Sequence, residues 1–122
     1  MYEVFVDREF SAAHRLSGYK GKCEELHGHN WLVRVYVGAK ELNEIGLGID
    51  FHDIKKATDE ILKELDHKNL NELSYFTREN PSSENIARFI YQRLSERINS
   101  DKAKVTRVRV METSTAGVDY SE

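Results

Sequence analysis

The stretch WLVRVYV, Trp31 to Val37, decides the fold class of this chain. Every second residue in it is large and apolar: Trp31, Val33, Val35 and Val37. Arg34 falls on the opposite side. Because successive side chains of a β-strand point to opposite faces of the sheet, this alternation predicts a strand with one buried face. We therefore expect a fold built around a β-sheet.

Three further segments are predicted to be strands of the same sheet: residues 2–10, 105–113 and 118–120. The first alternates between apolar and acidic side chains, and the second is rich in β-branched residues. In the second, Glu112 falls on the same face as Val108 and Val110. The third follows a turn at Gly117 and is expected to pair back on the second.

Two helices are predicted between these strands. The first begins after Asp50, a suitable N-cap, and is expected to end near Leu65. The second is expected to have Asn80 as its cap and Pro81 at its first helical position, where the missing N–H matters least. Each helix has apolar residues at helical spacing: Phe51, Ile54, Ile61, Leu62 and Leu65 in the first, and Ile86, Phe89, Ile90, Leu94 and Ile98 in the second.

The order of predicted elements is β-β-α-α-β-β. It implies an α+β domain in which a four-stranded antiparallel sheet carries both helices on one face. The other face and the sheet edges are left for something else to bury, and oligomerisation is the natural candidate. At 122 residues the chain fits a single domain, residues 1–122.

Composition narrows the range of partners. The 18 Lys and Arg residues against 21 Asp and Glu residues give a net charge of −3, without the basic excess that nucleic-acid binding normally requires. No apolar run approaches the ~20 residues that cross a bilayer. We therefore expect a soluble, cytoplasmic protein that binds neither nucleic acid nor membranes. The lone Cys23 cannot form an intramolecular disulfide, so it serves packing, metal binding or reactivity.

The histidines are the first candidates for chemistry. His27 and His29 flank Gly28, and an extended segment places residues i and i+2 on the same side about 7 Å apart at Cα. His14, at the end of the first strand, joins them if the first two strands pair. Three neutral imidazoles with an open fourth position are typical of catalytic zinc. The alternative is that all three are ordinary surface or core histidines.

Cys23 lies four residues before His27, in a polar loop that also contains Lys20 and Lys22. A positive environment and a nearby metal favour the thiolate form, which suits a reactive cysteine. Two alternatives stay open. Cys23 would make the site structural if it were a fourth metal ligand, and it would be inert if it were only a small packing residue.

Two carboxylates complete the set of candidates. Asp66 precedes His67 at the end of the first helix, where it can fix the imidazole tautomer and support acid and base chemistry, or the pair can be a solvated helix end. Glu112 extends an apolar strand face, so its charge needs a partner. Either an arginine or the guanidine-like edge of a heterocycle would supply one.

These motifs closely resemble those of the family of 6-pyruvoyltetrahydropterin synthase and 6-carboxytetrahydropterin synthase. The resemblance spans nearly the whole chain in order. It is carried by FSAAH ending at His14, CEELHGHN from Cys23 to Asn30, GIDF from Gly48 to Phe51, LDHKNLN from Leu65 to Asn71, NPSSEN, and METSTAG from Met111 to Gly117. The resemblance implies the tunnelling fold, or T-fold, with subunits forming oligomeric barrels, commonly homohexamers, and active sites between subunits.

The resemblance also implies roles for the candidate residues. His14, His27 and His29 match the zinc ligands, Cys23 the catalytic thiol, Asp66 with His67 the acid–base pair, and Glu112 the residue that anchors the pterin ring. The family's substrate is 7,8-dihydroneopterin triphosphate. Zinc would bind the oxygens of its side chain and acidify the adjacent positions, while Cys23 and His67 would move protons.

Members of the family differ in product. The spacing of Cys23 from His27 resembles that of the queuosine-pathway members, which make 6-carboxytetrahydropterin and acetaldehyde by carbon–carbon cleavage. Another group makes the folate precursor 6-hydroxymethyldihydropterin with a glutamate at the position of Glu24, so a dual activity is also open. The alternative is that Glu24 is only a loop acid beside Glu25. A pyruvoyl product is a third possibility. Outside enzymes, the alternative is a zinc-stabilised binding module in which Cys23 closes the metal site.

Overall fold

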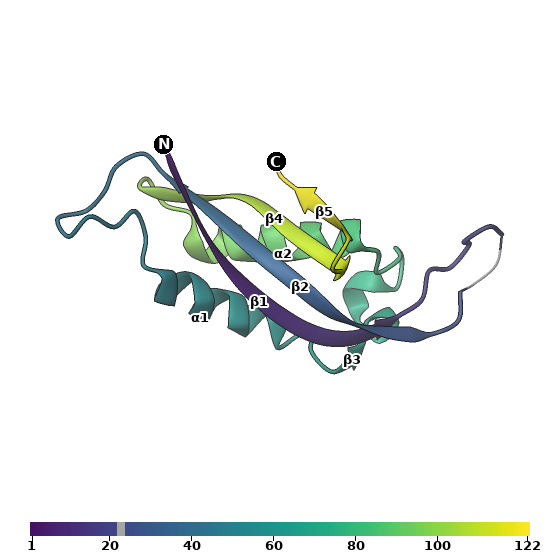
Figure 1. Ribbon diagram of the computed structural model, residues 1–122. Coiled ribbons are helices and arrows are strands. Elements are labelled where there is room, and N and C mark those ends of the chain that lie inside the picture. The colour runs from purple at the N-terminus through teal and green to yellow at the C-terminus, as the bar shows by residue number, and fades with distance from the viewer. Residues whose placement is uncertain (22–23) are drawn as a thin grey trace.

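A five-stranded sheet forms the frame of the protein (Figure 1). The structure is a computed structural model that describes residues 1–21 and 24–122. The strands lie in the order β3-β1-β2-β4-β5, and every neighbouring pair is antiparallel except β1 and β3. Their bounds are β1 Tyr2–His14, β2 His27–Ala39, β3 Lys68–Asn69, β4 Ala103–Thr113 and β5 Ala116–Tyr120.

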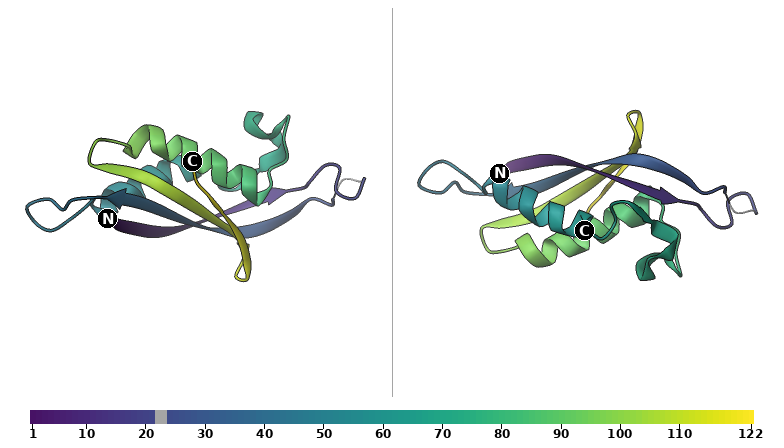
Figure 2. Two further views of the ribbon diagram at one scale, coloured as in Figure 1. Left: turned by 90° about the horizontal axis from the view of Figure 1, so that it is seen from above. Right: turned by 90° about the horizontal axis from the view of Figure 1, so that it is seen from below.

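Two α-helices, α1 (Phe51–Leu62) and α2 (Ser83–Ile98), cover one face of the sheet. Both views in Figure 2 place them on the same side of the strands. Two short 3₁₀ turns, η1 (Leu70–Glu72) and η2 (Ser74–Phe76), connect β3 with α2. The predicted α+β architecture with two helices on one face is therefore confirmed.

The core lies between the helices and the sheet. The alternating side chains of β2 that decided the fold class, from Trp31 to Val37, are fully buried. They pack against the buried stripes of the two helices, where Ile54 and Ile61 of α1 and Ile90 of α2 are also fully buried. Burying a side chain of this size contributes roughly 1.5–3 kcal/mol, so this layer is the main source of stability.

The boundaries of both helices differ from the prediction. Asp50 caps α1 as expected, but α1 ends at Leu62 instead of near Leu65. The backbone then tightens into turns, because the chain must reverse at His67, which has a positive φ of 57°. Helix α2 begins at Ser83 with Ser82 as its cap, two residues later than predicted, because the side chain of Asn80 bonds instead to Ser17.

The reversal at His67 also explains why the sheet has five strands instead of the predicted four. The N–H of His67 donates to the carbonyl of Ser11, and the carboxylate of Asp66 accepts from the N–H of Ser11. These bonds lay the two residues of β3 alongside Ala12 and Ala13 of β1. A two-residue strand has no alternation that a sequence pattern could reveal.

The face of the sheet that the helices leave open carries ion pairs. Asp7, Arg34, Arg109 and Asp119 occupy matching positions on β1, β2, β4 and β5, and we call these four residues the charge row. Arg34 bonds to Asp7 at 2.7 and 2.9 Å, and Arg109 bonds to Asp119 at 2.7 and 3.0 Å. The four charges of this row are therefore paired within the chain, and the cover that the sequence predicts for this face, a second subunit, stays a prediction.

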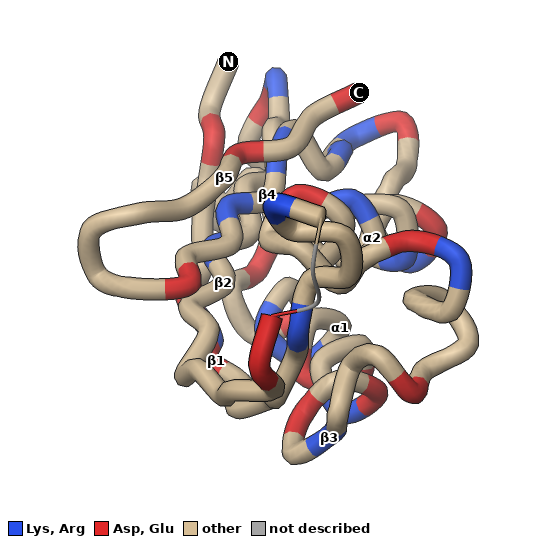
Figure 3. Tube along the Cα trace, turned by 90° about the vertical axis from the view of Figure 1, so that its right-hand side faces the viewer, with Lys and Arg blue, Asp and Glu red and all other residues tan. Residues whose placement is uncertain are grey.

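Charge elsewhere is mixed in sign. Figure 3 shows Lys and Arg interspersed with Asp and Glu along the trace. Within residues 1–21 and 24–122, no helix combines the length and the apolar character that a membrane span requires.

Candidate functional site

Four potential ligand side chains meet where β1, β2 and β4 lie side by side. They are His14, His27, His29 and Glu112, and one ligand atom from each lies within 4.8 Å of the others. Strand register brings the histidines together, because His14 pairs directly with His27 and Ala12 pairs with His29. The structure thus confirms the predicted meeting of the three histidines. We call these four residues the histidine cluster.

A hydrogen bond fixes the tautomer of His14. Its Nδ1 lies 2.7 Å from the carbonyl oxygen of Pro81, and the side chain is only 2% exposed. A carbonyl oxygen can only accept, so Nδ1 carries the proton and the lone pair of Nε2 points into the cluster. Metal-binding histidines commonly use the second ring nitrogen in this way.

His27 is held in the same manner. Its Nδ1 lies 2.8 Å from the carbonyl oxygen of Glu25, which again leaves the lone pair of Nε2 free. The two orienting carbonyls come from different parts of the chain, one before α2 and the other in the loop between β1 and β2.

His29 supplies the third nitrogen. Its Nε2 is buried and has no hydrogen-bond partner among the described residues. Glu112 Oε1 lies only 2.8 Å away, but the geometry does not make a hydrogen bond. Burial lowers the pKa of His29 against the opposing pull of Glu112, and His14 and His27 lower it further. The imidazole therefore favours the neutral form that binds metals.

These residues fit a zinc ion. Neutral imidazole nitrogens are preferred zinc ligands, and a buried nitrogen without a hydrogen-bond partner is costly unless a cation takes its lone pair. The donor set does not identify the metal on its own, because imidazole also binds copper, iron and nickel. The histidine cluster is therefore a candidate metal centre.

Asp66 and His67 form the predicted carboxylate–imidazole pair. Asp66 Oδ2 lies 2.9 Å from His67 Nδ1, while Oδ1 accepts from the N–H of Ser11 at 2.9 Å. The N–H of Ser11, followed by the contact with His67, lowers the pKa of Asp66. Asp66 is thus held as a carboxylate that orients one ring nitrogen of His67.

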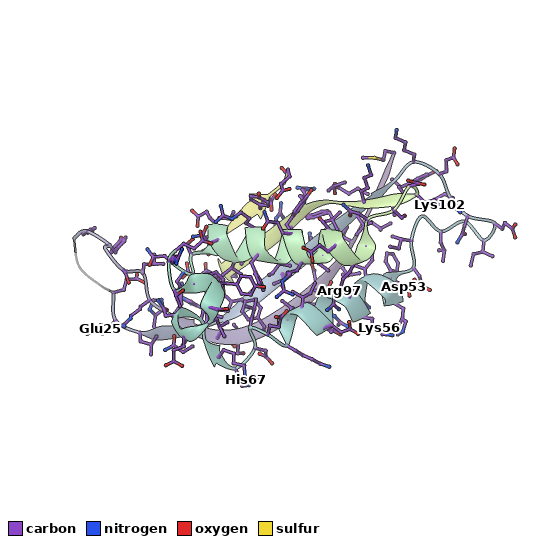
Figure 4. The ribbon with its side chains drawn as sticks, turned by 180° about the vertical axis from the view of Figure 1, so that it is seen from behind. Glu25, Asp53, Lys56, His67, Arg97 and Lys102 are labelled. Atoms are coloured by element: carbon purple, nitrogen blue, oxygen red, sulfur yellow. The ribbon has the colours of Figure 1, made fainter. Side chains whose placement is uncertain are left out.

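The pair does not join the histidine cluster within this chain. The His67 side chain is 80% exposed, and Figure 4 shows it at the lower margin of the structure, on the opposite side of the view from Lys102. Nε2 of His67 is therefore open to whatever lies outside the protomer. An acid–base role for His67 requires that a substrate or a second subunit reaches it there.

Two asparagines hold the segment that follows His14. Asn71 accepts from the N–H of Arg15 and donates to its carbonyl, both at 2.9 Å. Asn80 bonds in the same way to the N–H and carbonyl of Ser17, at 2.8 and 2.9 Å. Each side-chain amide thus bonds to both backbone groups of one residue, and the segment leaving His14 is held at Arg15 and Ser17.

Glu24 bonds to the same segment from its other side. Its carboxylate accepts from the N–H of Leu16 at 3.0 Å, and its own N–H donates to the Leu16 carbonyl at 3.1 Å. Glu24 is therefore tied to the loop backbone in this structure. The predicted catalytic thiol, Cys23, lies outside the described residues.

The sequence analysis missed several residues that shape the site: Asn71, Asn80, and the carbonyls of Glu25 and Pro81. Asn71 belongs to LDHKNLN, and Asn80 and Pro81 belong to NPSSEN. The signal that could have identified the two asparagines was a polar side chain within a loop-forming motif. Backbone carbonyls leave no signal in a sequence, because every residue has one.

Comparison with known proteins agrees with this geometry. The family model described as 6-pyruvoyl tetrahydropterin synthase matches residues 3–122. A 6-carboxy-5,6,7,8-tetrahydropterin synthase from Synechocystis sp. is 36% identical over 98% of this chain and 93% of its own. A dihydroneopterin monophosphate aldolase from Pyrococcus furiosus is 37% identical over 95% of this chain and 94% of its own.

A solved structure agrees on the fold. The 6-pyruvoyl tetrahydropterin synthase of Caenorhabditis elegans superimposes with a TM-score of 0.81 and 26% identity, covering 100% of this chain and 97% of the other. The sheet, the paired helices and the histidine-bearing strands are thus arranged as in known pterin synthases. With a match that spans almost every residue, the chain belongs to the 6-pyruvoyl tetrahydropterin synthase family.

Proposed function

We propose that this protein is a zinc-dependent 6-carboxy-5,6,7,8-tetrahydropterin synthase that acts on 7,8-dihydroneopterin triphosphate. The observation that carries the proposal is the convergence of three imidazoles with Glu112, where two lone pairs are aimed by carbonyl partners. The name of the Synechocystis relative supports this branch of the family. So does the spacing of Cys23 from His27, which resembles that of queuosine-pathway members.

Each residue has a distinct task in the proposed reaction. His14, His27 and His29 would hold zinc, and the bound ion would supply Lewis-acid polarisation of the substrate's side-chain oxygens, which would make neighbouring hydrogens more acidic. Cys23 accepts a proton as thiolate, and His67, oriented by Asp66, transfers another. Glu112 accepts N–H bonds from the pterin ring and sets its position relative to these groups.

The test is product identification. Purified protein that contains stoichiometric zinc is incubated with 7,8-dihydroneopterin triphosphate, and the products are separated and identified by mass spectrometry. We expect 6-carboxytetrahydropterin with acetaldehyde and triphosphate. A Cys23→Ala variant is expected to lose the activity, since removing a general base typically costs about 10²–10⁴ in rate. A protein that releases no acetaldehyde from this substrate is not a carboxypterin synthase.

A second function is favoured by the Pyrococcus furiosus relative, which is named an aldolase of dihydroneopterin monophosphate. In this alternative the product is 6-hydroxymethyl-7,8-dihydropterin and Glu24 acts as the base. Glu24 would first have to release the N–H of Leu16 that its carboxylate accepts. The alternative predicts hydroxymethylpterin that disappears in Glu24→Ala but persists in Cys23→Ala. A pyruvoyl product would favour the third branch of the family.

We also propose that the protein works as an oligomer, as a homohexamer by family resemblance, with active sites between subunits. Two features support assembly. Nε2 of His67 faces outward from the protomer, and among the described strands β1 is paired by β3 only at Ala12 and Ala13. Light scattering on purified protein measures the assembly directly. A monomer that is fully active would contradict a shared site.

A further inference from the structure

The carboxylate of Glu112 lies in contact with two of the three imidazoles. Oε1 is 3.2 Å from Nε2 of His14 and 2.8 Å from Nε2 of His29. A residue that only anchored a pterin ring would have no reason to point at the metal ligands. Its position therefore needs an explanation from the cluster itself.

The contact with His14 is between two acceptors. His14 gives the proton of its Nδ1 to the carbonyl of Pro81, so its Nε2 has only a lone pair when the ring is neutral. A carboxylate oxygen also has only lone pairs. Two such atoms repel each other at 3.2 Å unless a cation lies between them.

A shared metal ion resolves this repulsion, and the distances suit it. Ligand atoms bonded to tetrahedral zinc at about 2.0–2.2 Å lie about 3.3–3.5 Å from one another. The contact of Glu112 Oε1 with His14, at 3.2 Å, is close to that separation, and its contact with His29, at 2.8 Å, is shorter. The orphaned Nε2 of His29 gains a partner in the same arrangement.

We propose that Glu112 is a fourth metal ligand in the substrate-free protein and leaves the metal when a pterin ring binds. This inference rests on the proposed function, because it takes a pterin as the substrate. The guanidine-like edge of the ring offers two parallel N–H groups, which occupy both oxygens of one carboxylate. Ring binding and metal ligation by Glu112 therefore compete, and the exchange frees one metal position for an oxygen of the substrate.

The consequence is selectivity for substrates with a pterin ring. With Glu112 bound, the metal has four protein ligands, which is the arrangement of a closed site. A polyol or phosphate ester without the ring would have to displace a charged ligand unaided. When Glu112 binds the ring, it holds the ring in position and leaves the metal in the same step.

The test uses Co²⁺ in place of zinc, because the visible spectrum of Co²⁺ reports a change of ligand. The metal-free protein is loaded with Co²⁺ as wild type, as Glu112→Gln and as Glu9→Gln. Glutamine keeps the size of Glu112 and removes its charge, while Glu9 is an exposed acid on β1. We expect an altered spectrum and binding weakened by about tenfold or more in Glu112→Gln, and neither change in Glu9→Gln.

The second step adds unsubstituted pterin, which has the ring but no side-chain oxygen to bind the metal. We expect the wild-type spectrum to move toward that of Glu112→Gln, and the variant spectrum to stay unchanged. If Glu112→Gln does not fold, this titration of the wild type still tests the exchange. Pterin binding that leaves the wild-type spectrum unchanged would overturn the exchange.

The outcomes separate the inference from the proposed function. Identical substrate-free spectra for wild type and Glu112→Gln would show that Glu112 is not a ligand, while the enzyme could still make carboxypterin. Wild-type protein that binds no stoichiometric metal would instead remove the proposed function together with the inference.

Discussion

Two polar clusters lie on the same sheet, and they differ in whether their polar side chains find partners within the chain. In the charge row, each arginine makes two bonds to an aspartate on the neighbouring strand. In the histidine cluster, lone pairs converge and no cation among the described residues meets them. The charge row is thus complete within the chain, whereas the histidine cluster could hold a metal ion.

The difference explains why one cluster is structural and the other is a candidate site. Paired exposed charges contribute little energy, roughly 0.2–1 kcal/mol each, but they let the open face of the sheet meet water. Like charges would otherwise repel, because Arg34 and Arg109 occupy paired positions on β2 and β4. Water cannot satisfy the histidine cluster in the same way, because His14 is buried. A metal ion could accept its lone pairs.

The largest expected effect is the loss of metal binding in His29→Ala. The variant removes a buried cluster nitrogen that has no hydrogen-bond partner among the described residues, so the site falls to two imidazoles. We expect zinc affinity to fall by more than about a hundredfold, because the removal of even an orienting partner costs 10–100-fold. Competition with a chromophoric chelator measures the affinity.

His52→Ala is the matched control for this prediction. His52 lies exposed in the first turn of α1 and does not belong to the histidine cluster. Its replacement should leave the zinc affinity unchanged. Equal loss of affinity in both variants would mean that zinc binds elsewhere and that the histidine cluster is not the metal centre.

Zinc is expected to stabilise the protein, which is the second largest effect. A ligand that binds only the folded state at a hundred times its Kd adds about 2.7 kcal/mol to the free energy of unfolding. Urea denaturation with and without excess zinc measures this gain, and a chelator should reverse it. His29→Ala should show no gain, whereas Asp119→Asn should show the full gain, because the charge row does not contribute to the metal centre.

The contrast between the clusters also explains what could be predicted from sequence. His27 and His29 share a strand face through their spacing alone, so their convergence was predictable. His14 required only that two adjacent strands pair. The charge row depends on the register of four strands at once, with β4 and β5 far from β1 in the chain, and no local pattern specifies that register.

The same limit applies to the residues around the metal centre. The contact of Glu112 with His14 crosses from β4 to β1, 98 positions along the chain. The bonds from Asn71 and Asn80 to the segment after His14 depend on turns whose course a sequence pattern does not fix. Spacing within an element was informative here, and contacts between elements required the structure.

A small effect is expected for breaking the charge row. Asp119→Asn removes the carboxylate that accepts from both Arg107 and Arg109. We expect the free energy of unfolding to fall by about 0.2–1 kcal/mol, because these side chains are a third exposed and water screens them. A double-mutant cycle with Arg109→Gln isolates the pair. A coupling energy between Asp119 and Arg109 above about 2 kcal/mol would instead mean that the row stabilises the protein as strongly as a buried ion pair.

The smallest expected effect is a loss of the stability that the charge row contributes as the pH falls. Hydrogen bonds from Arg34 and from Arg109 lower the pKa values of Asp7 and Asp119 respectively. A carboxylate with a lowered pKa in the folded state contributes stability above its unfolded pKa, about 3.9, and loses it as the pH falls through the folded pKa. The free energy of unfolding of metal-free protein should therefore decrease below about pH 4. The double variant Asp7→Asn/Asp119→Asn should start lower at pH 7 and decrease less by pH 3, as measured by urea denaturation. An equal decrease in both proteins would show that other carboxylates carry the acid sensitivity and that the row adds nothing to it.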